Sequence, residues 1–537
     1  MHLTRLRVTN HSRLADLDIE VRRHLVLVGA NDVGKSSLLR CLDLLLGAST
    51  AQLYARITSD DVRDPELPFV IEAELTGFDQ SDKALFPDEI SISEATGDAS
   101  LTLRLSATFD SNQTLSVERA APGGGTGRQL SREQVAGVGW QLLGAMSASR
   151  DLRDDRKSVI DDILRTVELG TEKADFEAIA AQLKGQLGAS DVLGTLRTNL
   201  ASQLSKALPD AVGKDDLHFV PGATAEEDVL NDVRLQVSKD GVPRNLGEQS
   251  DGTRALYAIA LYDLVSVGAN MVAIDEPEVH LHPTSQRNLA KLLQSSANQK
   301  FIATQSADIV GAFAPECVVV VRGGGVIVQP ATNFLTNEER MTVRWWVRDR
   351  LEPLTARRVA AVEGISDRII LECAAELTGR NLDRLGVSVA ETGGAGDMGA
   401  IIKLFGKDGF DVPISMLIDA DAANETAAKL GVPVSDLKLN SVWVSTPDLE
   451  AEYVAALGAD AVWSAVSSSP HFKPNELTVG PISGTGGSRT EADVAAFCRW
   501  NSKYKVRAAM TVAPLLTASS ASAISSIDKL LNEIATL

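Results

Sequence analysis

The sequence predicts an α/β protein with two domains, and three observations lead to that prediction. The chain has 537 residues, of which 44% are hydrophobic and 23% are charged, so it can bury more than one core. Two regions, 25–46 and 358–377, each place a short apolar strand before a glycine-containing loop and a helix. In each domain, further apolar strands end in carboxylates. Strands that alternate with helices in this way favour parallel sheets.

Composition indicates a cytoplasmic protein with no membrane partner. Residues 1–10 contain no apolar core of a signal peptide, and no run of about eighteen apolar residues occurs in the chain. The cysteines are scattered and show neither metal-type nor disulfide-type spacing, as expected in a reducing compartment. They are Cys41, Cys317, Cys373 and Cys498.

The net charge of −20 argues against a protein that coats nucleic acid with its whole surface. Binding of a polyanion would need a local basic groove or bound cations. One basic and aromatic cluster stands out, although a hinge packed between domains explains it equally well or better. It consists of Arg344, Arg348, Arg350, Arg357 and Arg358 around Trp345 and Trp346.

The loop 29–36 reads G-A-N-D-V-G-K-S and lies between an apolar strand, 25–28, and an expected helix, 37–46. Glycines let such a loop turn its N–H groups toward a phosphate, Lys35 can bridge the terminal phosphates, and the Ser36 hydroxyl can bind magnesium. A plain glycine turn would not explain the Lys-Ser pair. The residues expected to contact ATP or its Mg²⁺ ion are Gly29, Asn31, Gly34, Lys35, Ser36 and Ser37.

A second nucleotide motif lies far down the chain. The apolar strand 270–274 ends in Asp275 and Glu276. Asp275 can hold the magnesium shell, and Glu276 can orient or deprotonate the attacking water. Carboxylates are common at strand ends, but together with the loop at 29–36 this pair predicts a nucleotide hydrolase.

Just upstream, Ser250 and Gly252 open an apolar helix expected over 255–265. A hydroxyl and backbone N–H groups at the positive end of a helix can bind an anion. An ordinary helix cap would explain Ser250 by itself.

These segments, in this order, resemble the ATP-binding-cassette ATPases of the chromosome-maintenance and recombination type. The resemblance implies an ATP-sandwiched homodimer in which Ser250 and Gly252 cap the nucleotide of the opposite subunit. Gln305 departs from the pattern, because many cassette ATPases have histidine there. Glutamine can donate a hydrogen bond to a γ-phosphate but cannot ionise, so slow turnover or use of ATP as a switch is an alternative.

A long insertion separates the loop from the later motifs. We expect strands around 68–76 and 101–109, a glycine-rich turn at 123–127, and helices filling about 132–210. The helical arm could bind a partner, dimerise or cover DNA. Its charged cluster 149–153 is explained best as a solvated helix start.

After residue 357 a new α/β pattern begins. The predicted strand 358–362 runs into Glu363 and Asp367, and a helix is expected over 368–377. A strand over 387–390 precedes the glycines 393–396, and a strand over 414–418 precedes Asp419 and Asp421. Carboxylates therefore gather at the carboxyl edge of a parallel sheet, where open α/β folds place their ligands.

The pattern E-G-x-x-D followed by D-x-D resembles the Toprim domain of primases, topoisomerases and certain nucleases. The expected ligands are Glu363, Asp419 and Asp421 for one Mg²⁺ or Mn²⁺ ion, and Asp367 and Glu450 for a second. Two ions about 4 Å apart can activate water and stabilise a leaving oxygen, and Lys505 could offset charge on the phosphate. Taken singly, these acids could be helix caps or surface residues, and Lys503 competes with Lys505.

A cassette ATPase followed by a Toprim domain resembles the OLD (overcoming lysogenization defect) nucleases. The resemblance implies metal-dependent nicking or cleavage of DNA, dimerisation or higher assembly, and bacterial defence against phage. Some members need a helicase-like or other partner. We expect an ATPase domain over 1–340, a linker over 341–357, and a Toprim domain with a C-terminal helical extension over 358–537.

The prediction is therefore an ATP-regulated DNA endonuclease in which ATP either licenses or restrains cutting. One alternative is a DNA-clamping ATPase for repair or recombination, without nuclease activity. Another is RNA cleavage or topoisomerase-type strand passage, for which Tyr504 is the tyrosine to test.

Overall fold

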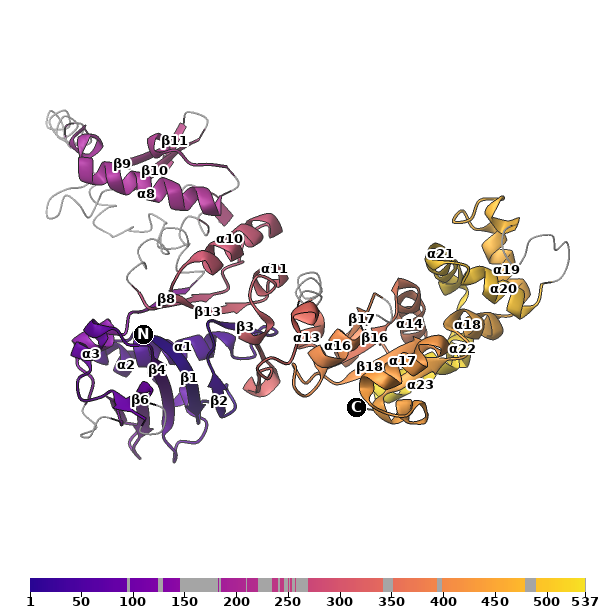
Figure 1. Cartoon of the computed structure of the whole chain (residues 1–537), viewed down its shortest axis with the longest axis horizontal. Helices are drawn as coiled ribbons and strands as arrows, with labels where there is room; N and C mark the ends of the chain where they lie inside the picture. The colour runs from indigo at the N-terminus through magenta and orange to yellow at the C-terminus, as the bar shows by residue number, and fades with distance from the viewer. Residues whose placement is uncertain are drawn as a thin grey trace. The chain divides into compact units, whose positions relative to one another are not determined.

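The computed structural model describes residues 1–93, 97–123, 129–144, 182, 185–208, 210–220, 234–239, 242–245, 250, 252–253, 256, 269–340, 351–393, 398–478 and 489–536. The described residues up to Gln329 form one compact unit, and those from Pro330 onward form a second (Figure 1). Most of the expected linker lies outside the described residues, as do the tryptophans and three of the arginines of the basic cluster.

From the sequence we assign residues 330–340 to the first domain. In the structure, this segment instead contacts residues of the second unit. Lys403 Nζ lies 2.7 Å from Glu339 Oε1, and the ring of Phe334 packs edge-on against Phe410. This segment therefore belongs structurally to the second unit.

The first unit contains a six-stranded sheet in the order β15-β14-β3-β13-β12-β8. Its pairs are parallel except for β14 with β15. All residues of the central strands β3, β13 and β14 are buried, as expected for a sheet covered on both faces. The strands are β3 (Leu25–Val28), β8 (Trp140–Gly144), β12 (Met271–Asp275), β13 (Gln299–Thr304), β14 (Val318–Val321) and β15 (Ile327–Val328).

An antiparallel sheet, in the order β2-β1-β4-β6-β5 with β7 paired to β6, forms a second layer. Buried residues alternate with less buried ones along β1, β4 and β6, which marks a sheet with one face on the core. The strands are β1 (His2–Thr9), β2 (Leu17–Glu20), β4 (Phe69–Thr76), β5 (Ser91–Ile92), β6 (Ala99–Phe109) and β7 (Leu115–Ala120).

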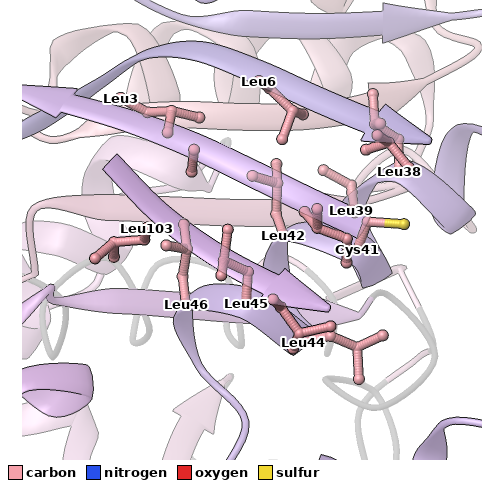
Figure 2. Packing of buried hydrophobic residues seen from close by; sticks show 14 of the residues in the cluster. Leu3, Leu6, Leu38, Leu39, Cys41, Leu42, Leu44, Leu45, Leu46 and Leu103 are labelled. Atoms are coloured by element: carbon pink, nitrogen blue, oxygen red, sulfur yellow. The ribbon is translucent and has the colours of Figure 1, made fainter. Parts of the chain in front are cut away.

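Helix α1 (Lys35–Leu46) contacts both of these sheets, and its leucines lie between them. Figure 2 shows leucines of α1, among them Leu39 and Leu42, beneath Leu6 of β1, within one buried cluster that also contains Leu3 and Leu38. Burial of apolar side chains on both sides of a helix anchors it firmly. The phosphate loop is therefore held by a rigid strand before it and a rigid helix after it.

The other described helices of the first unit are short or peripheral. They are α2 (Thr50–Arg56), α3 (Gln80–Leu85), α4 (Arg132–Gly137), α8 (Asp191–Ala207), α10 (Pro283–Ser295) and α11 (Ala307–Val310). A three-stranded antiparallel sheet, β11-β10-β9, is an addition that the sequence analysis did not predict. It comprises β9 (Leu217–Val220), β10 (Arg234–Lys239) and β11 (Val242–Asn245).

The prediction that helices fill 132–210 is wrong for part of that segment. Residues 140–144 form β8, which pairs in parallel with β12, so that Trp140 lies opposite Met271. A short apolar run cannot be assigned to helix or strand by periodicity, and the partner strand decided it. Helices α4 and α8 are as expected, whereas residues 145–181, with the cluster 149–153, and most of the turn 123–127 lie outside the described residues.

The second unit is built on a four-stranded parallel sheet in the order β17-β16-β18-β19. Two separate hydrophobic clusters include residues of its strands. The three strands predicted from the sequence are confirmed within one residue. The bounds are β16 (Arg358–Val362), β17 (Val387–Glu391), β18 (Ile414–Asp419) and β19 (Val442–Ser445).

Helices surround this sheet and continue into a helical C-terminal region (Figure 1). They are α13 (Glu352–Thr355), α14 (Ile365–Leu377), α15 (Leu382–Leu385), α16 (Met398–Phe405), α17 (Ala423–Leu430), α18 (Leu449–Leu457), α19 (Ala459–Ser468), α20 (Glu491–Cys498), α21 (Ser502–Val512), α22 (Ala518–Ala523) and α23 (Ser525–Ala535). None of the helices in the described part of the chain is long and apolar enough to cross a membrane.

Candidate functional site

The loop between β3 and α1 has the backbone geometry of a phosphate cradle. Gly34 precedes the first residue of α1 with φ 111°, a conformation that favours glycine. A Cβ atom on Gly29 would lie 2.3 Å from the carbonyl oxygen of Val321, so the neighbouring strand leaves no room for a side chain. The loop therefore delivers the N-terminus of α1, with its free N–H groups, to a potential anion site.

Lys35 lies inside this loop. Its Nζ donates hydrogen bonds to the carbonyl oxygens of Gly29, at 2.9 Å, and Ala30, at 2.6 Å. Burial lowers the pKa of Lys35, while the nearby carboxylates, led by that of Glu276, act in the opposite direction. The ammonium is thus held at the loop by carbonyl groups that a phosphate could replace.

The parallel sheet brings the two distant nucleotide motifs together. Ser36 Oγ donates a hydrogen bond to Asp275 Oδ1 at 3.0 Å, although 239 residues separate them. Burial raises the pKa of Asp275, and the hydrogen bond from Ser36 opposes that rise. These two oxygen atoms are the pair expected to share a magnesium shell. Ser37 lies partly buried in the first turn of α1.

Gln305 joins the loop to the acid that follows β12. Its Nε2 donates hydrogen bonds to Asn31 Oδ1 and, at 3.2 Å, to Glu276 Oε1. Glu276 has φ 48°, a left-handed conformation that is uncommon for a residue other than glycine and is enriched at functional sites. Asn31, Glu276 and Gln305, three residues predicted from the sequence, therefore meet.

Ser250 and Gly252 lie in a different environment. Ser250 Oγ lies 2.9 Å from Thr253 Oγ1 and accepts the Thr253 N–H at 3.4 Å, which is a local cap. A Cβ on Gly252 would lie 2.5 Å from the carbonyl oxygen of His280. Within the described part of the chain, neither residue has a hydrogen bond to the phosphate loop. The role in capping a partner's nucleotide stays a prediction.

The second unit gathers carboxylates at the carboxyl ends of two strands. Glu363 follows β16, Asp419 ends β18, and Asp421 follows two residues later. One oxygen from each of these three side chains lies within 4.8 Å of the others. Glu363 Oε1 also accepts the backbone N–H of Asp419 at 3.0 Å, which fixes the two strand ends together. Three converging carboxylate oxygens fit Mg²⁺ or Mn²⁺.

Lys505 reaches the same group from α21. Its Nζ donates a hydrogen bond to Asp419 Oδ2 at 3.0 Å and lies 3.4 Å from Glu450 Oε2. Burial would lower the pKa of Lys505, but the carboxylates of Glu450 and Asp419 outweigh it, so the pKa is raised. Lys503, the competing lysine, pairs instead with Glu476 at 3.8 Å.

Asp367 and Glu450 lie beside the three-carboxylate group but are not part of it. Asp367 Oδ2 accepts the N–H of Gly364 at 2.8 Å in the first turn of α14. Burial, followed by the charges of Asp419 and Glu450, raises the pKa of Asp367 to about 7. Glu450 is 1% exposed, and burial raises its pKa to about 7. Their assignment to a second ion stays a prediction.

Two further residues support this centre and were not predicted from the sequence. Asp448 accepts the Ala451 N–H at 2.8 Å as the cap of α18, and its other oxygen accepts a hydrogen bond from Arg499 at 2.6 Å. The capping role was visible in the order P-D-L-E, whereas no local signal marked Arg499. Leu449 N–H donates to Asp419 Oδ1 at 3.0 Å, so the start of α18 also orients a candidate ligand.

Tyr504, the tyrosine considered for strand passage, points into an aromatic cluster. Its ring lies 5.2 Å from that of Phe497 and 5.6 Å from that of Phe472, and the residue is buried. Burial raises the pKa of its hydroxyl. A tyrosine whose ring is fixed in this cluster and whose pKa is raised is poorly suited to act as the nucleophile, which weakens the topoisomerase alternative.

Two family models match this chain. Residues 25–136 and 138–310 match an AAA domain, and these two stretches cover more than half of the chain. Residues 354–421 match the model described as overcoming lysogenization defect protein-like, TOPRIM domain. The second match contains four of the five candidate metal ligands of the second unit.

A curated relative from Thermus scotoductus (strain ATCC 700910 / SA-01) is named OLD nuclease. It is 23% identical over 458 residues, which are 78% of this chain and 82% of the relative. Among solved structures, an Smc head domain bound to the C-terminal domain of ScpA from Pyrococcus furiosus matches with a TM-score of 0.40 and 15% identity, over 65% of this chain and 99% of that one. The C-terminal region of the Burkholderia pseudomallei OLD protein matches with a TM-score of 0.27 and 20% identity, over 34% and 98%.

Proposed function

Because this chain belongs to the OLD family, in which an ATPase domain precedes a Toprim domain, we propose that it is an ATP-regulated, divalent-metal-dependent DNA endonuclease. The observation that supports the nuclease most directly is the convergence of Glu363, Asp419 and Asp421 within 4.8 Å. Lys505 beside them supplies a positive charge where a phosphodiester would bind. A role in bacterial defence against phage, and assembly as a homodimer or higher oligomer, are part of this proposal.

The carboxylate group has the chemistry of a divalent-cation site. Burial raises the pKa of Glu363, the charges of Asp419 and Asp421 add to this rise, and Lys505 opposes it. One ammonium group beside three acids leaves an excess of negative charge that a cation would balance. Glu363, Asp419 and Asp421 would hold Mg²⁺ or Mn²⁺. When bound, such an ion supplies Lewis acidity and lowers the pKa of a bound water.

The protein side chains would contribute charge and proton acceptance. Lys505 Nζ would neutralise negative charge that develops on the phosphate during in-line displacement. Glu450 Oε2 lacks a hydrogen-bond donor among the described residues and has only the ion pair with Lys505, so it can accept a proton from an attacking water or bind a second cation. Asp448 and Arg499 would hold the start of α18, and thereby Glu450, in place.

The first unit would bind and hydrolyse ATP. Lys35 and the α1 N-terminus would hold the phosphates, Ser36 and Asp275 the magnesium ion, and Glu276 the attacking water. ATP would regulate the nuclease by stabilising one conformation or assembly state over another. We expect DNA access to the carboxylates to differ between these states.

Plasmid nicking tests the proposal. Purified protein is incubated with supercoiled plasmid and Mg²⁺ or Mn²⁺, with and without ATP, beside Glu363→Gln and Asp421→Asn. We expect nicked or linear product that falls at least about 100-fold in both variants, because each loses a candidate ligand charge. Asp460→Asn, which changes an exposed carboxylate on α19, serves as the matched control and should cut like the wild type.

The ATP arm uses Lys35→Ala, which should lose ATP binding, so that its metal-dependent cleavage no longer changes when ATP is added. Cleavage above that of the wild type without ATP, or below that of the wild type with ATP, shows whether ATP restrains or licenses cutting. Cleavage that persists in Glu363→Gln would show that another site cuts DNA. If no condition yields cleavage while ATP hydrolysis is intact, the result favours a DNA-clamping ATPase or a nuclease that needs a partner protein.

A further inference from the structure

The turn after β12 contains a carboxylate that the proposed mechanism does not use. Glu278 lies two residues after Glu276, and its side chain reaches the end of the neighbouring strand β13. Glu278 Oε2 accepts a hydrogen bond from Thr304 Oγ1 at 2.8 Å, and Glu278 Oε1 accepts the backbone N–H of Gln305 at 2.5 Å. Both oxygens of one side chain thus bind adjacent residues of one strand end.

The Thr304 hydroxyl continues this network. Besides donating to Glu278, its oxygen accepts the backbone N–H of Ser306 at 3.0 Å. Burial raises the pKa of Glu278, while the hydrogen bonds from Gln305 and Thr304 act in the opposite direction. The carboxylate therefore holds the backbone from 304 to 306 from one side.

This backbone determines where the Gln305 side chain lies. Its amide nitrogen donates one hydrogen bond to Asn31 in the phosphate loop and another to Glu276. An uncharged amide is placed mainly by its backbone and its hydrogen bonds, because it lacks the long-range attraction of an ion. A shift of the strand end would separate Gln305 from both partners.

We infer that Glu278 is a positioning residue for ATP hydrolysis, which acts by holding the Gln305 amide between the phosphate loop and Glu276. The inference rests on the proposed ATPase function of the first unit. In the described part of the chain Glu278 makes no hydrogen bond or ion pair with the loop, and its charge acts on Lys35 only at longer range. Its direct contacts are with Thr304 and Gln305, so we infer that it acts through Gln305.

The same carboxylate is not needed to join the strands. β12 and β13 pair in parallel over five residues of each strand, and the backbone N–H of Glu276 donates to the carbonyl oxygen of Ala303 at 2.8 Å. The sheet therefore stays paired when the Glu278 side chain is shortened. The expected defect is confined to the segment that carries Gln305.

The test compares ATP hydrolysis and ATP binding in Glu278→Ala, Gln305→Ala and the double variant. We expect kcat of Glu278→Ala to fall roughly 10- to 100-fold, because small misplacements of catalytic groups have effects of that size. KM and the affinity for a fluorescent ATP analogue should stay within about twofold. The double variant should hydrolyse ATP as slowly as Gln305→Ala, because Glu278 has no further effect once the Gln305 amide that it positions is gone.

Two conservative variants separate positioning from stability. Thr304→Ser keeps the hydroxyl that donates to Glu278 and should retain most of kcat. Thr304→Val removes this hydroxyl and should lower kcat in the same direction as Glu278→Ala. If Glu278 only stabilised the fold, Glu278→Ala would lower the melting temperature, but kcat would not depend on whether residue 304 carries a hydroxyl group.

Three results would overturn the inference. The first is wild-type kcat in Glu278→Ala, and the second is a loss in the double variant that equals the product of the two single losses. The third is a loss of ATP binding in Glu278→Ala that matches the loss in Lys35→Ala. If the wild type itself binds ATP but releases no phosphate, the proposed ATPase fails and the positioning role fails with it.

Discussion

At the residue scale, charge balance distinguishes the two candidate centres. Among the described residues of the second unit, five carboxylates lie close together, and one ammonium group, that of Lys505, pairs with two of them. Three of these carboxylates, those of Asp367, Asp419 and Glu450, are buried, and burying like charges together is costly unless protons or cations compensate. The raised pKa values of Asp367 and Glu450 express this deficit. In the first unit the Lys35 ammonium has two carbonyl oxygens as hydrogen-bond partners, which a phosphate could replace.

Because of the buried residue His24, we expect the first unit to lose stability as the pH falls. His24 is 6% exposed, its Nδ1 accepts the Lys300 N–H at 3.1 Å, and burial, followed by the charges of Arg23 and Lys300, lowers its pKa to about 4. In the unfolded chain the group titrates near 6.5. The stability that depends on neutral His24 is therefore fully present above pH 6.5 and is lost as the pH falls toward 4, because only the unfolded chain binds the proton readily in that range. We expect this loss to be on the order of 2 kcal/mol.

Denaturant unfolding of wild type and His24→Asn between pH 7.5 and 4.5 measures this difference. Asparagine keeps an acceptor near the Nδ1 position but does not titrate, so the stability of the variant should depend less on pH. His280→Asn, at an exposed position with left-handed φ that asparagine tolerates, is the control. Parallel pH profiles for wild type and His24→Asn would contradict the prediction.

At the element scale, both centres form at the carboxyl edge of a parallel sheet. β3 and β12 deliver the phosphate loop and Asp275 to one edge, and β16 and β18 deliver Glu363 and Asp419 to another. Parallel strands end at the same edge, so residues that follow them meet although they are far apart in sequence. Hydrogen bonds between strand ends, such as Asp419 N to Glu363 Oε1, then set the final geometry.

We expect helix α23 to stabilise the second unit through one side chain, that of Glu533. Glu533 accepts hydrogen bonds from Arg358 at 2.8 Å, Trp443 Nε1 at 2.6 Å and Ser415 Oγ at 3.2 Å, so one side chain joins the helix to three strands. Glu533→Gln leaves Arg358 with a weaker partner. We expect the unfolding free energy of the second unit to fall by about 1–3 kcal/mol.

Thermal and denaturant unfolding test this prediction, with Lys529→Ala as the control on the same helix. Lys529 is exposed, so its removal should change the unfolding free energy by less than about 0.5 kcal/mol. Equal effects of Glu533→Gln and Lys529→Ala would mean that the polar network does not anchor α23.

At the scale of the whole molecule, the chain contains separate cores for separate chemistries. The cluster around α1 belongs to the first unit, and the clusters around the β16 sheet belong to the second. Units with their own cores can unfold independently. A ligand that binds one folded unit stabilises that unit by mass action, by about 2.7 kcal/mol at 100 times its Kd.

We therefore expect two unfolding transitions that respond to different ligands. Mn²⁺ alone should raise the midpoint of one transition, and this effect should disappear in Asp419→Asn. Addition of ATP to protein already in Mg²⁺ should raise the other, and this effect should disappear in Lys35→Ala. Differential scanning calorimetry of the wild type and both variants measures these shifts. A single transition that either ligand moves would mean that the units unfold together.

Local order along the chain determined much of the fold and the site. The phosphate loop lies between a strand and a helix that are recognisable from consecutive residues, and the acids follow apolar runs that became β12, β16 and β18. These features depend on neighbours in sequence, such as glycines that permit a turn and apolar residues that require burial. For the same reason the sequence predicted which residue types collect at each sheet edge.

Only the tertiary structure determined the contacts between residues that lie far apart in the sequence. The run 140–144 became a strand because β12 pairs with it, and Lys505 rather than Lys503 reaches the carboxylates because of how α21 packs. Glu278 and Arg499 acquired their contacts across strand ends and between helices, with no local signal. The physical reason is that hydrogen bonds and ion pairs require a partner within about 3–4 Å, and only folding brings residues so far apart in sequence to that distance.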